Sequence, residues 1–585
     1  MIKTVKYFLR ITVFWLLFFM VVKFYFLLIN AEFIGTDLAS FPEIWWEGLQ
    51  MDVSIVGYFS IIPLLLLLIN NWWPKTLSVI TKVYWGVVWL FAILTVAVDP
   101  YFFKYWGQKT NLGFTQFLGK ENAGLLSIEW TTYAVALGFM IITTIWFFRR
   151  GISHLSVPEK SNWLIAIVLI AISGLMLRGS VDKVPINVSS AYFSSNNLYN
   201  NTAVNSIWSF LATEFERGSQ EALSFFETRE EAEKILQENT VEASADFSKL
   251  IKDTKEKNVI LIILESFSAK TVGFLSGEKY GSTPKLDNIL ENGIAYTNVY
   301  AASFRSDKGL LALTTGIPSS ARQTLTNFPE KLAHKPNIFE VLADDYTTGF
   351  YYGGNMEFAN IKVLFKDADV RKGQDDFGST KANAWGVHDE EVFDVFTKDF
   401  LRESKPQFKM LFSLSSHEPF DVPNFKKKNS PYLNSIAYTD SCLGVMMSAL
   451  RASEKWKNTL VIITADHGSI LPDKAPIFDT ANFKIPLVLT GGVVQRDTVI
   501  TDIVSQSDIA ATISQYAIGE NVFPQKTLFT PSNKAYYSYH NGLTYVSDTC
   551  VQSYNLDYKK YMNPECTQPF EKAYYQLAND DFFNH

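Results

Sequence analysis

Cysteine is scarce in this 585-residue chain, which contains only three, at positions 442, 550 and 566. Three thiols are too few for the disulfide scaffold of a small secreted domain, and none stands in a Cys-x-x-Cys or zinc-binding spacing. Cys550 and Cys566 are near enough in sequence to pair in an oxidising compartment. The sequence leaves open whether they pair or whether all three are free or buried thiols.

An excess of positive charge is also missing, because 59 acidic residues outnumber 52 lysines and arginines and give a formal net charge of -7. A phosphate backbone requires a basic surface, so nucleic acid is excluded as the main partner. An anionic lipid requires a basic surface only locally. The net charge is therefore compatible with membrane lipid as a partner.

Long hydrophobic runs are absent after about residue 180 but dominate the chain before it. A helix needs ~20 apolar residues to cross a bilayer core. About five segments predict such helices: 8–29, 52–70, 78–98, 132–148 and 162–177. The first is not typical of a cleaved signal peptide, because it contains Lys23 and further apolar segments follow it.

Basic and acidic connections alternate between these segments. The basic residues are Lys3, Lys6 and Arg10 at the start, Lys75 and Lys82 after the second segment, and Arg149, Arg150 and Lys160 after the fourth. The first connection instead carries Glu32, Asp37, Glu43, Glu47 and Asp52. Basic connections stay in the cytoplasm, so the amino-terminus is predicted to lie inside. An odd number of spans then places the chain after residue 180 outside the cytoplasm, in a multi-pass protein of the cell (inner) membrane.

A chain of this length is expected to form more than one folding unit. Residues 1–180 are predicted to form a transmembrane domain. Residues 181–257 are predicted to be a partly helical connector, because the sequence from about 214 onwards is charged and poor in glycine. Residues 258–585 have the composition of an α/β protein and are predicted to form the extracytoplasmic domain.

Two apolar runs in the last domain each end at an acidic residue. The run 258–264 is followed by Glu265, and the run 459–464 leads to Ala465 and then to Asp466 and His467. Such runs are typical of buried parallel strands. Ligands bind beyond the carboxyl ends of the strands in open α/β sheets. The three side chains are therefore predicted to meet at one sheet edge as metal ligands, although a strand-ending acid can also be a helix cap.

A third motif, Arg305-Ser306-Asp307-Lys308, stands before an apolar segment that predicts a helix. A hydroxyl between two cations at a helix start suits a nucleophile, because the cations and the helix N-terminus favour its alkoxide and an incoming phosphate. A serine at this place is also a common helix cap. Ser303 is the competing hydroxyl.

The order of the motifs resembles that of the lipoteichoic acid synthase and phosphoglycerol transferase family, in the sulfatase-like branch of the alkaline phosphatase superfamily. The motifs that carry the resemblance are Glu265-Ser266-Phe267, Arg305-Ser306, Ser416-His417-Glu418-Pro419-Phe420 and Asp466-His467-Gly468. The likeness extends over nearly the whole chain. It implies an α-helical transmembrane domain of about five spans, followed by an α/β sulfatase-like catalytic domain with a mostly parallel central sheet.

The resemblance also implies roles for single residues. Glu265, Asp466 and His467 match the family's metal ligands, and Ser306 matches its nucleophile, where the family usually has threonine. Arg305 matches the basic residue that precedes that nucleophile, which favours Ser306 over Ser303.

Three more residues match the family's substrate site. His417 matches a substrate-contacting histidine, which could hydrogen-bond a phosphate oxygen or protonate a leaving alkoxide. Trp385 lies in a segment that matches one near the family's site. The family's substrate loop carries Trp and Arg where this chain has Ala359 and Ile361, so Asn360 is predicted to be the polar contact.

The resemblance implies a membrane-bound, metal-dependent phosphoglycerol transferase. One cation held by Glu265, Ser306, Asp466 and His467 would lower the hydroxyl pKa and neutralise phosphate charge. Oxygen ligands with one imidazole suit Mn²⁺ or Mg²⁺ better than zinc, and the family favours Mn²⁺. Ser306 would take glycerol phosphate from phosphatidylglycerol or a related phospholipid donor. The phospho-serine would then pass it to a glycan or polymer acceptor.

Three alternatives are weighed against this function. A phosphoethanolamine transferase shares the topology and the hydroxyl nucleophile, but it would have extra His ligands and several disulfides. A sulfatase would need a Cys/Ser-x-Pro-x-Arg motif, which this chain lacks at Ser306. A catalytically silent envelope protein that binds glycan fits the altered substrate loop, but it does not explain the complete set of metal-site residues.

Overall fold

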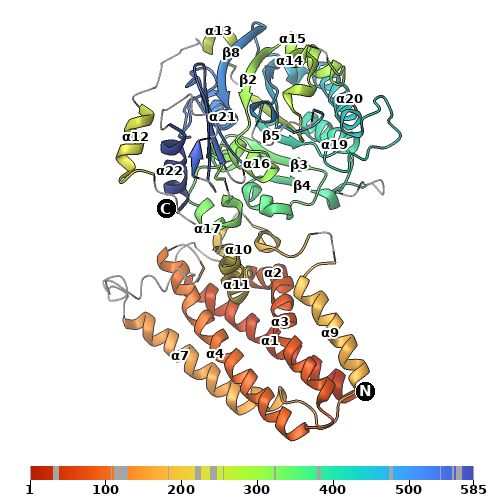
Figure 1. The fold of residues 1–585 in the computed structure, drawn as a ribbon, viewed down its shortest axis with the longest axis vertical. Helices are drawn as coiled ribbons and strands as arrows, with labels where there is room; N and C mark the ends of the chain where they lie inside the picture. The colour runs from red at the N-terminus through yellow and green to blue at the C-terminus, as the bar shows by residue number, and fades with distance from the viewer. Residues whose placement is uncertain are drawn as a thin grey trace. The chain divides into compact units, whose positions relative to one another are not determined.

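A computed structural model describes most of the chain. The described residues are 2–30, 38–106, 109–110, 130–181, 184–194, 196–217, 225–237, 247–254, 256–277, 279–321, 324–378, 383, 385–473, 479–539, 542–556, 559–561 and 570–583. The chain divides into two compact units, Met1–Gln220 and Glu221–His585 (Figure 1). The division at residue 220 falls inside the predicted connector, whose first part belongs to the helical unit.

The first unit consists of helices. They are α1 (Ile2–Asn30), α2 (Phe41–Glu47), α3 (Leu49–Ile69), α4 (Pro74–Trp106), α7 (Trp130–Trp146), α8 (Ile152–His154), α9 (Trp163–Arg178), α10 (Asn197–Ala203) and α11 (Ser206–Arg217). Aromatic side chains fill its core, where Trp15, Trp85, Trp89 and Phe147 are almost fully buried. Because aliphatic side chains of the same helices stay exposed, this unit has the apolar exterior of a membrane protein.

Within the described residues, four helices are long and apolar enough to cross a membrane: Ile2–Asn30, Leu49–Ile69, Pro74–Lys104 and Thr131–His154. The fifth predicted span is a shorter apolar helix, α9, of 16 residues. Its length is limited by an Asn162 N-cap, whose side chain accepts a hydrogen bond from the Ile165 amide, and by Gly179, which ends the helix at φ 71°.

The helix α9 nevertheless runs along the length of α3. At one end, Gln50 donates a side-chain hydrogen bond to the carbonyl of Gly179, at 2.7 Å. At the other end, Asn71 donates one to the carbonyl of Ser161, at 2.9 Å. Between them, Gly57 lets the two backbones approach closely, since a β-carbon there would lie 2.6 Å from the Leu177 nitrogen.

Two buried ion pairs lie inside the helical unit. Lys23 of α1 contacts Asp52 of α3 at 2.7 Å, and Lys109 contacts Asp99 of α4 at 2.9 Å. The segment after α9 completes both pairs, because Asn205 donates to Asp52 and Ser206 donates to Asp99. These polar contacts fix residues 205–206 on the helices that precede them.

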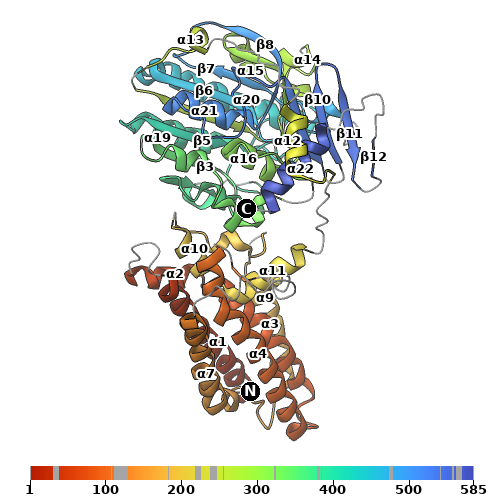
Figure 2. The same cartoon turned by 90° about the vertical axis from the view of Figure 1, so that its left-hand side faces the viewer.

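The second unit is built on a mostly parallel sheet, as predicted (Figure 2). Its strands are β1 (Asn258–Leu264), β2 (Ile294–Tyr300), β3 (Thr347–Tyr352), β4 (Val370–Lys372), β5 (Gln407–Phe412), β6 (Thr459–Ala465), β7 (Leu487–Thr490) and β8 (Thr498–Ser505). They lie in the order β4-β3-β5-β1-β6-β7-β2-β8, and β7 is antiparallel to both neighbours. The central strands β1 and β6 are buried along their whole length, which explains their continuous apolar sequences.

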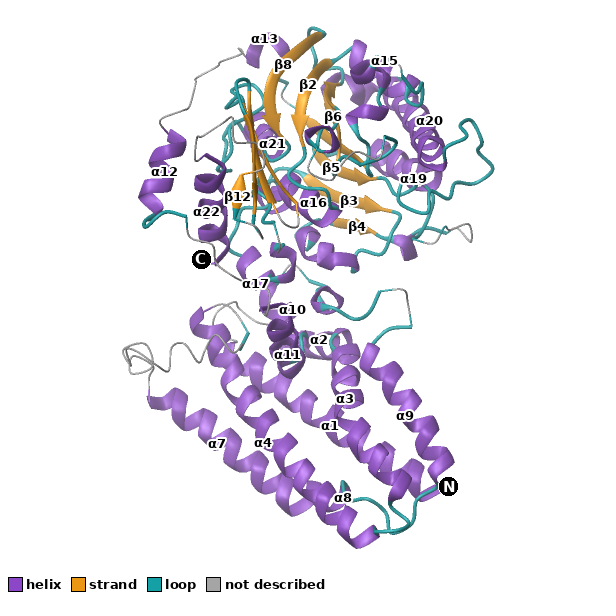
Figure 3. Cartoon of the chain, in the orientation of Figure 1, coloured by secondary structure: helices purple, strands orange, loops and turns teal. Residues whose placement is uncertain are grey.

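Helices cover both faces of this sheet (Figure 3). The longer helices of this unit are α12 (Arg229–Gln237), α15 (Pro284–Glu291), α16 (Ser306–Thr315), α19 (Asp389–Arg402), α20 (Pro431–Arg451), α21 (Asp508–Ile518) and α22 (Phe570–Phe583). Of these, α12 and α22 pack on each other, and α22 contacts the smaller sheet described next. The short ones are α13 (Phe247–Leu250), α14 (Gly273–Ser276), α17 (Pro329–Leu332) and α18 (Ile338–Val341). Helices α15, α19 and α20 form one layer, and α16, α18 and α21 form the other.

A smaller antiparallel sheet follows the main one in the chain, with strands β9 (Lys534–Tyr539), β10 (Gly542–Ser547), β11 (Val551–Asn555) and β12 (Lys560–Tyr561). Cys550, just before β11, is disulfide-bonded. Cys442 is a free and buried thiol. Cys566 lies outside the described residues.

Candidate functional site

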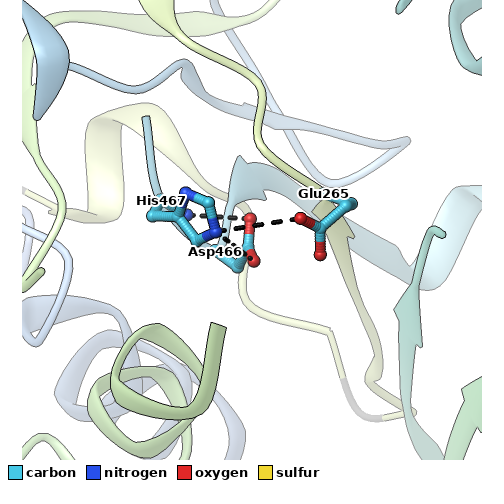
Figure 4. A group of neighbouring side chains, drawn as sticks. All are labelled: Glu265, Asp466 and His467. Atoms are coloured by element: carbon cyan, nitrogen blue, oxygen red, sulfur yellow. Dashed lines mark hydrogen bonds and ion pairs between the residues drawn. The ribbon is translucent and has the colours of Figure 1, made fainter. Parts of the chain in front are cut away.

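Two neighbouring parallel strands place the predicted ligands side by side. Strands β1 and β6 pair in register, with Leu264 opposite Ala465. Glu265 and Asp466 are the next residues of the two strands, so both leave the same edge of the sheet. His467 follows directly, and the predicted convergence of the three side chains is observed (Figure 4).

The ligand atoms of Glu265, Asp466 and His467 lie within 4.8 Å of one another. The His467 Nε2 atom is 3.3 Å from Asp466 Oδ2 and 3.7 Å from Glu265 Oε1. Both carboxylates are almost completely buried, with 1% and 0% of their side chains exposed. Two buried carboxylates at this separation repel each other unless protons or a cation compensate their charge.

The hydrogen bonds of Asp466 leave one of its oxygens unused. Oδ1 accepts from the backbone amides of Ser266 and His467, both at 2.8 Å. Oδ2 is buried and accepts no hydrogen bond within the described part of the chain. An oxygen of this kind, beside a second carboxylate and an imidazole, fits a divalent cation.

The charge of Glu265 is unfavourable in this setting. Burial, and next the neighbouring charge of Asp466, raise the pKa of Glu265 well above its ordinary value. A bound cation would reverse this effect by favouring the ionised carboxylate.

Ser306 is the first residue of α16 and directs its hydroxyl to the same cluster. Its Oγ is 3.4 Å from Glu265 Oε2 and 3.5 Å from His467 Nε2. Because α16 begins here, its partial positive charge favours an anion beside the hydroxyl. The hydroxyl is therefore placed between the carboxylate–imidazole cluster and a natural phosphate-binding position.

Helix α16 is held against the end of β6 through Gly309. A β-carbon there would lie 2.0 Å from the carbonyl oxygen of Asp466. We expect Gly309→Ala to displace α16 or Asp466, to cost ~1–3 kcal/mol of folding free energy and to reduce metal binding. Thermal unfolding and metal titration of the purified protein would measure both effects.

The matched control is Gly444→Ala in the middle of α20. Its added β-carbon meets the side chain of Lys285, which can move aside. Alanine also favours a helix over glycine by ~1 kcal/mol. Equal stability and metal affinity of the two variants would contradict the close packing of α16 on Asp466.

Two other residues of the predicted nucleophile motif point elsewhere. Ser303 is fully buried and donates to the carbonyl of Ser538 at 2.7 Å. Lys308 is also buried, and its ammonium donates to the carbonyls of Ser320 and Ala321. Burial lowers the pKa of Lys308 to about 8. The expectation that two cations flank Ser306 is therefore wrong for Lys308, because a helical residue two positions further on lies on another face.

A cavity of about 510 Å³ opens over Ser306. Its lining includes Glu265, Arg305, Ser306, His417 and His467, with the aromatic residues Phe304, Phe358, Phe420 and Tyr432. Arg305 is exposed, and its Nε donates to Asp307 at 3.1 Å. The cavity thus combines a hydroxyl, a carboxylate, a guanidinium and two imidazoles with an apolar wall, which suits a phosphoester attached to a larger apolar group.

His417 is oriented by its neighbours on the cavity wall. Its Nδ1 lies 2.9 Å from the carbonyl oxygen of Glu418, and its ring packs on that of Trp385 with centroids 4.4 Å apart. The Trp385 indole donates to the same carbonyl at 2.5 Å. If Nδ1 carries the proton, Nε2 is the free ring nitrogen. Trp385 does not line the cavity itself, but it contacts residues that do, among them His417 and Glu418.

Asn360 lies outside the cavity lining as well. Its side-chain amide donates to Asn327 at 2.7 Å, and both Ala359 and Asn360 adopt positive φ, at 52° and 58°. Phe358, two residues earlier, lines the cavity and meets the Trp385 ring at 5.4 Å. The predicted substrate loop therefore presents the ring of Phe358 to the cavity, while the side-chain amide of Asn360 stabilises the conformation of the loop.

Several residues support the cluster, and Gln506 and Ser413 among them were not predicted, whereas Ser416 belongs to a motif recognised in the sequence. Gln506, after β8, donates from its buried side chain to the carbonyls of Ala465 and Asp466 at 2.8 and 2.7 Å. Ser413 accepts from the Glu265 amide, and Ser416 donates to the Glu265 carbonyl. Gln506 and Ser413 are of types common in loops, so a single sequence does not distinguish them from other loop residues. The pairing of β1 with β5 brings Ser413 to the site, whereas Gln506 follows β8 and reaches it only in the completed sheet.

Comparison with known proteins was consistent with this architecture. The sulfatase family model matches residues 257–520. Lipoteichoic acid synthase 1 of Bacillus subtilis is 26% identical over 250 residues, which cover 37% of this chain and 37% of that protein. Phosphoglycerol transferase I of Xanthomonas campestris pv. campestris is 25% identical over 145 residues, covering 23% and 21%. The matches thus span well under half the length of these curated relatives.

A crystal structure of an alkaline phosphatase superfamily protein from Vibrio parahaemolyticus shares the fold. It superimposes with a TM-score of 0.54 at 23% sequence identity, over 62% of this chain and 98% of that one. Apolar helices of membrane-spanning length precede the matched domain here. Residues 257–520 thus match the sulfatase family model, and the chain is similar in sequence to lipoteichoic acid synthases and phosphoglycerol transferases and in fold to a protein of the alkaline phosphatase superfamily.

Proposed function

We propose that this chain is a membrane-bound phosphoglycerol transferase that uses Ser306 as its nucleophile. It moves glycerol phosphate from phosphatidylglycerol to a hydroxyl of a glycan or a growing polymer. The observation that carries the proposal is the position of Ser306 Oγ, 3.4 Å from Glu265 Oε2 and 3.5 Å from His467 Nε2 on an open cavity. The competing hydroxyl of Ser303 does not reach Glu265 and His467, because it is buried and donates its hydrogen bond to the Ser538 carbonyl.

In the first step, a bond forms between Ser306 Oγ and phosphorus while the bond from phosphorus to the diacylglycerol oxygen breaks. The hydroxyl proton passes to the Glu265 carboxylate, which accepts its hydrogen bond. His417 supplies a proton to the departing oxygen, so diacylglycerol leaves as an alcohol. Arg305 and the N-terminus of α16 attract the phosphate oxygens.

In the second step, an acceptor hydroxyl attacks the phospho-serine and the bond from Ser306 Oγ to phosphorus breaks. His417 removes the acceptor's proton, and Ser306 recovers its own from Glu265. The same residues thus act in reverse order, as expected for two similar displacements at one phosphorus atom.

Glu265, Asp466, His467 and Ser306 would hold a single Mn²⁺ or Mg²⁺ ion, to which they would offer three oxygens and one imidazole nitrogen. The unused Asp466 Oδ2 and the unfavourable charge of Glu265 support this assignment. When bound, the ion neutralises phosphate charge and lowers the pKa of the attacking hydroxyl.

The donor is tested by incubating the full-length protein in detergent with phosphatidylglycerol or phosphatidylethanolamine, each labelled in its headgroup. Intact-mass and peptide analysis would then show which headgroup becomes attached. We expect glycerol phosphate on the peptide that contains Ser306. Phosphoethanolamine on that peptide would identify an ethanolamine transferase, and an unmodified protein that hydrolyses or transfers neither lipid would favour a silent binding protein.

We also propose that residues 221–585 lie outside the cytoplasm. The basic start of the chain favours an internal amino-terminus, and the parity of the crossings then depends on α9. At ~1.5 Å per residue its 16 residues extend only ~24 Å, against ~30 Å for a bilayer core. Its hydrogen bonds to both ends of α3, through Gln50 and Asn71, support a full crossing.

Reporter fusions after His585 test this orientation. Alkaline phosphatase, active only outside, should be active, and a fluorescent protein that folds only in the cytoplasm should stay dark. Fusions after Ser161 and after Arg178 provide the control, since they bracket α9 and should report opposite sides. The same side for residues 161 and 178 would exclude a crossing by α9 and would place the sulfatase domain in the cytoplasm.

A further inference from the structure

A second groove lies in the helical unit, at the end of the bundle that holds the amino-terminus. It has a volume of about 390 Å³ and is lined by Lys6, Leu9, Arg10, Val13, Phe14 and His154. Five of these residues belong to α1, and His154 ends α8, which lies at the same end of the bundle (Figure 3). The lining therefore combines cationic and apolar side chains in a small area.

Among the residues that the structure describes, no acidic side chain pairs with the Lys6 or Arg10 of this groove. Across the described residues, neither Lys6 nor Arg10 forms an ion pair, in contrast to Lys23 further along the same helix, which pairs with Asp52. The nearby π-helical turn Phe147–Gly151 adds Arg149 and Arg150, which are both exposed. An unpaired positive charge this close to an apolar span is stabilised by an anion.

The order of residues along α1 separates charge from apolar surface. Lys6 and Arg10 are one helical turn apart on the groove side, close to the start of the helix. Leu9, Val13 and Leu17 continue the stripe inward and are 52%, 54% and 51% exposed. A ligand that follows this stripe meets cations first and then aliphatic side chains.

The far wall of the groove is rigid. Phe14 stacks on Trp146 with ring centroids 5.0 Å apart and an interplanar angle of 6°. Gly151 packs directly on the Phe14 ring, because a β-carbon there would lie 2.8 Å from its edge. These contacts hold the turn that carries His154 beside α1, so the groove is formed without a ligand.

From these features we infer that the groove binds one anionic phospholipid of the leaflet in which the amino-terminus of α1 lies. The phosphate contacts Lys6, Arg10 and His154, and an acyl chain lies along Leu9 and Val13. A free phosphate would use only the cations, whereas a phospholipid also covers the exposed aliphatic stripe. Basic pockets beside transmembrane helices recognise anionic headgroups in this way. The site is separate from the proposed catalytic cavity, since none of its residues lines that cavity.

The test uses the full-length protein in nanodiscs with photoreactive phosphatidylserine, an anionic lipid that is not the proposed donor. Labelling should concentrate on the peptide that contains residues 6–14 and should saturate near one lipid per chain. In Lys6→Gln/Arg10→Gln, labelling at this peptide should need roughly tenfold more lipid, because two cations near the headgroup are lost. Thermal unfolding should be unchanged, since both side chains are exposed.

The matched control is Lys75→Gln/Lys82→Gln, which removes the same charge from exposed positions that do not line the groove. It should label like the parent protein. Equal loss in both double variants would indicate general surface charge and would overturn the site. So would equal labelling by photoreactive phosphatidylcholine, or displacement by inorganic phosphate at the same phosphate concentration, which would identify a soluble anion.

Discussion

Replacement of Ser306 by alanine should abolish transfer, with a loss of at least ~10³-fold in kcat, while the protein remains folded and inserted. The reason is that the hydroxyl is the attacking atom in the proposed reaction. Within the described part of the chain, its hydroxyl makes two polar side-chain contacts, both long, at 3.4 and 3.5 Å, so stability should change by no more than ~0.5 kcal/mol. Turnover of headgroup-labelled lipid and thermal unfolding would measure the two quantities.

The competing serine provides the control. Ser303→Ala removes a buried hydrogen bond to the Ser538 carbonyl and should cost ~1 kcal/mol or more of stability. Because its hydroxyl does not reach the cluster, turnover per folded molecule should stay near the parent value. The opposite pattern, with activity lost in Ser303→Ala and kept in Ser306→Ala, would show that the wrong nucleophile was chosen.

Asp466→Asn should weaken metal binding by more than ~100-fold. Mutation of a residue that merely hydrogen-bonds to a metal ligand already lowers metal affinity by ~10–100-fold, and Asp466 is proposed to be a ligand itself. Asp466 Oδ1 accepts two backbone hydrogen bonds, so the asparagine oxygen must take that position. Its NH₂ group then replaces Oδ2 and points donors at His467, 3.3 Å away. Chelation should likewise stop transfer by the parent protein, and Mn²⁺ should restore it. Calorimetric titration with Mn²⁺ would measure the affinity.

A matched variant is Asp440→Asn in α20. This carboxylate is also buried and accepts two backbone amides, from Lys285 and Leu286, but it is not a member of the cluster. It should lose stability and keep its metal affinity. Unchanged Mn²⁺ affinity in Asp466→Asn would contradict its role as a ligand. Two zinc ions found by anomalous scattering would contradict the single-ion assignment.

The parts of the site that lie at strand ends were predictable from the sequence. Buried parallel strands have continuous apolar sequences, and side chains at their carboxyl ends meet at one edge, so Glu265 and Asp466 could be brought together on pattern alone. The mostly parallel sheet followed from the same runs and from the family resemblance. The short length of α9 was harder to predict, because an apolar run does not show at which capping residues the helix begins and ends.

Side-chain direction was the main quantity that the sequence could not supply. Lys308 is close to Ser306 in sequence, but it points to the carbonyls of Ser320 and Ala321. Asn360 has the polarity of a ligand contact, yet it donates to Asn327. The partners of Lys308 lie 12 and 13 residues further along the chain. Asn360 reaches a partner 33 residues away from a backbone conformation with positive φ. Gln506 could not be predicted either, because its contact with Asp466, 40 residues away in the chain, forms only in the completed sheet.

The ion pair between Lys23 and Asp52 bears on how the chain enters the membrane during synthesis. A lone lysine in an inserting helix costs up to ~3.5 kcal/mol at the translocon, the value for the helix centre, and Lys23 lies nearer the end of α1. Its partner is 29 residues downstream, on the next long helix, and the two are 2.7 Å apart in the folded protein. Helices α1 and α3 can therefore leave the translocon as a hairpin in which the two charges neutralise each other. Asn205 reaches Asp52 only after all the intervening helices have been made.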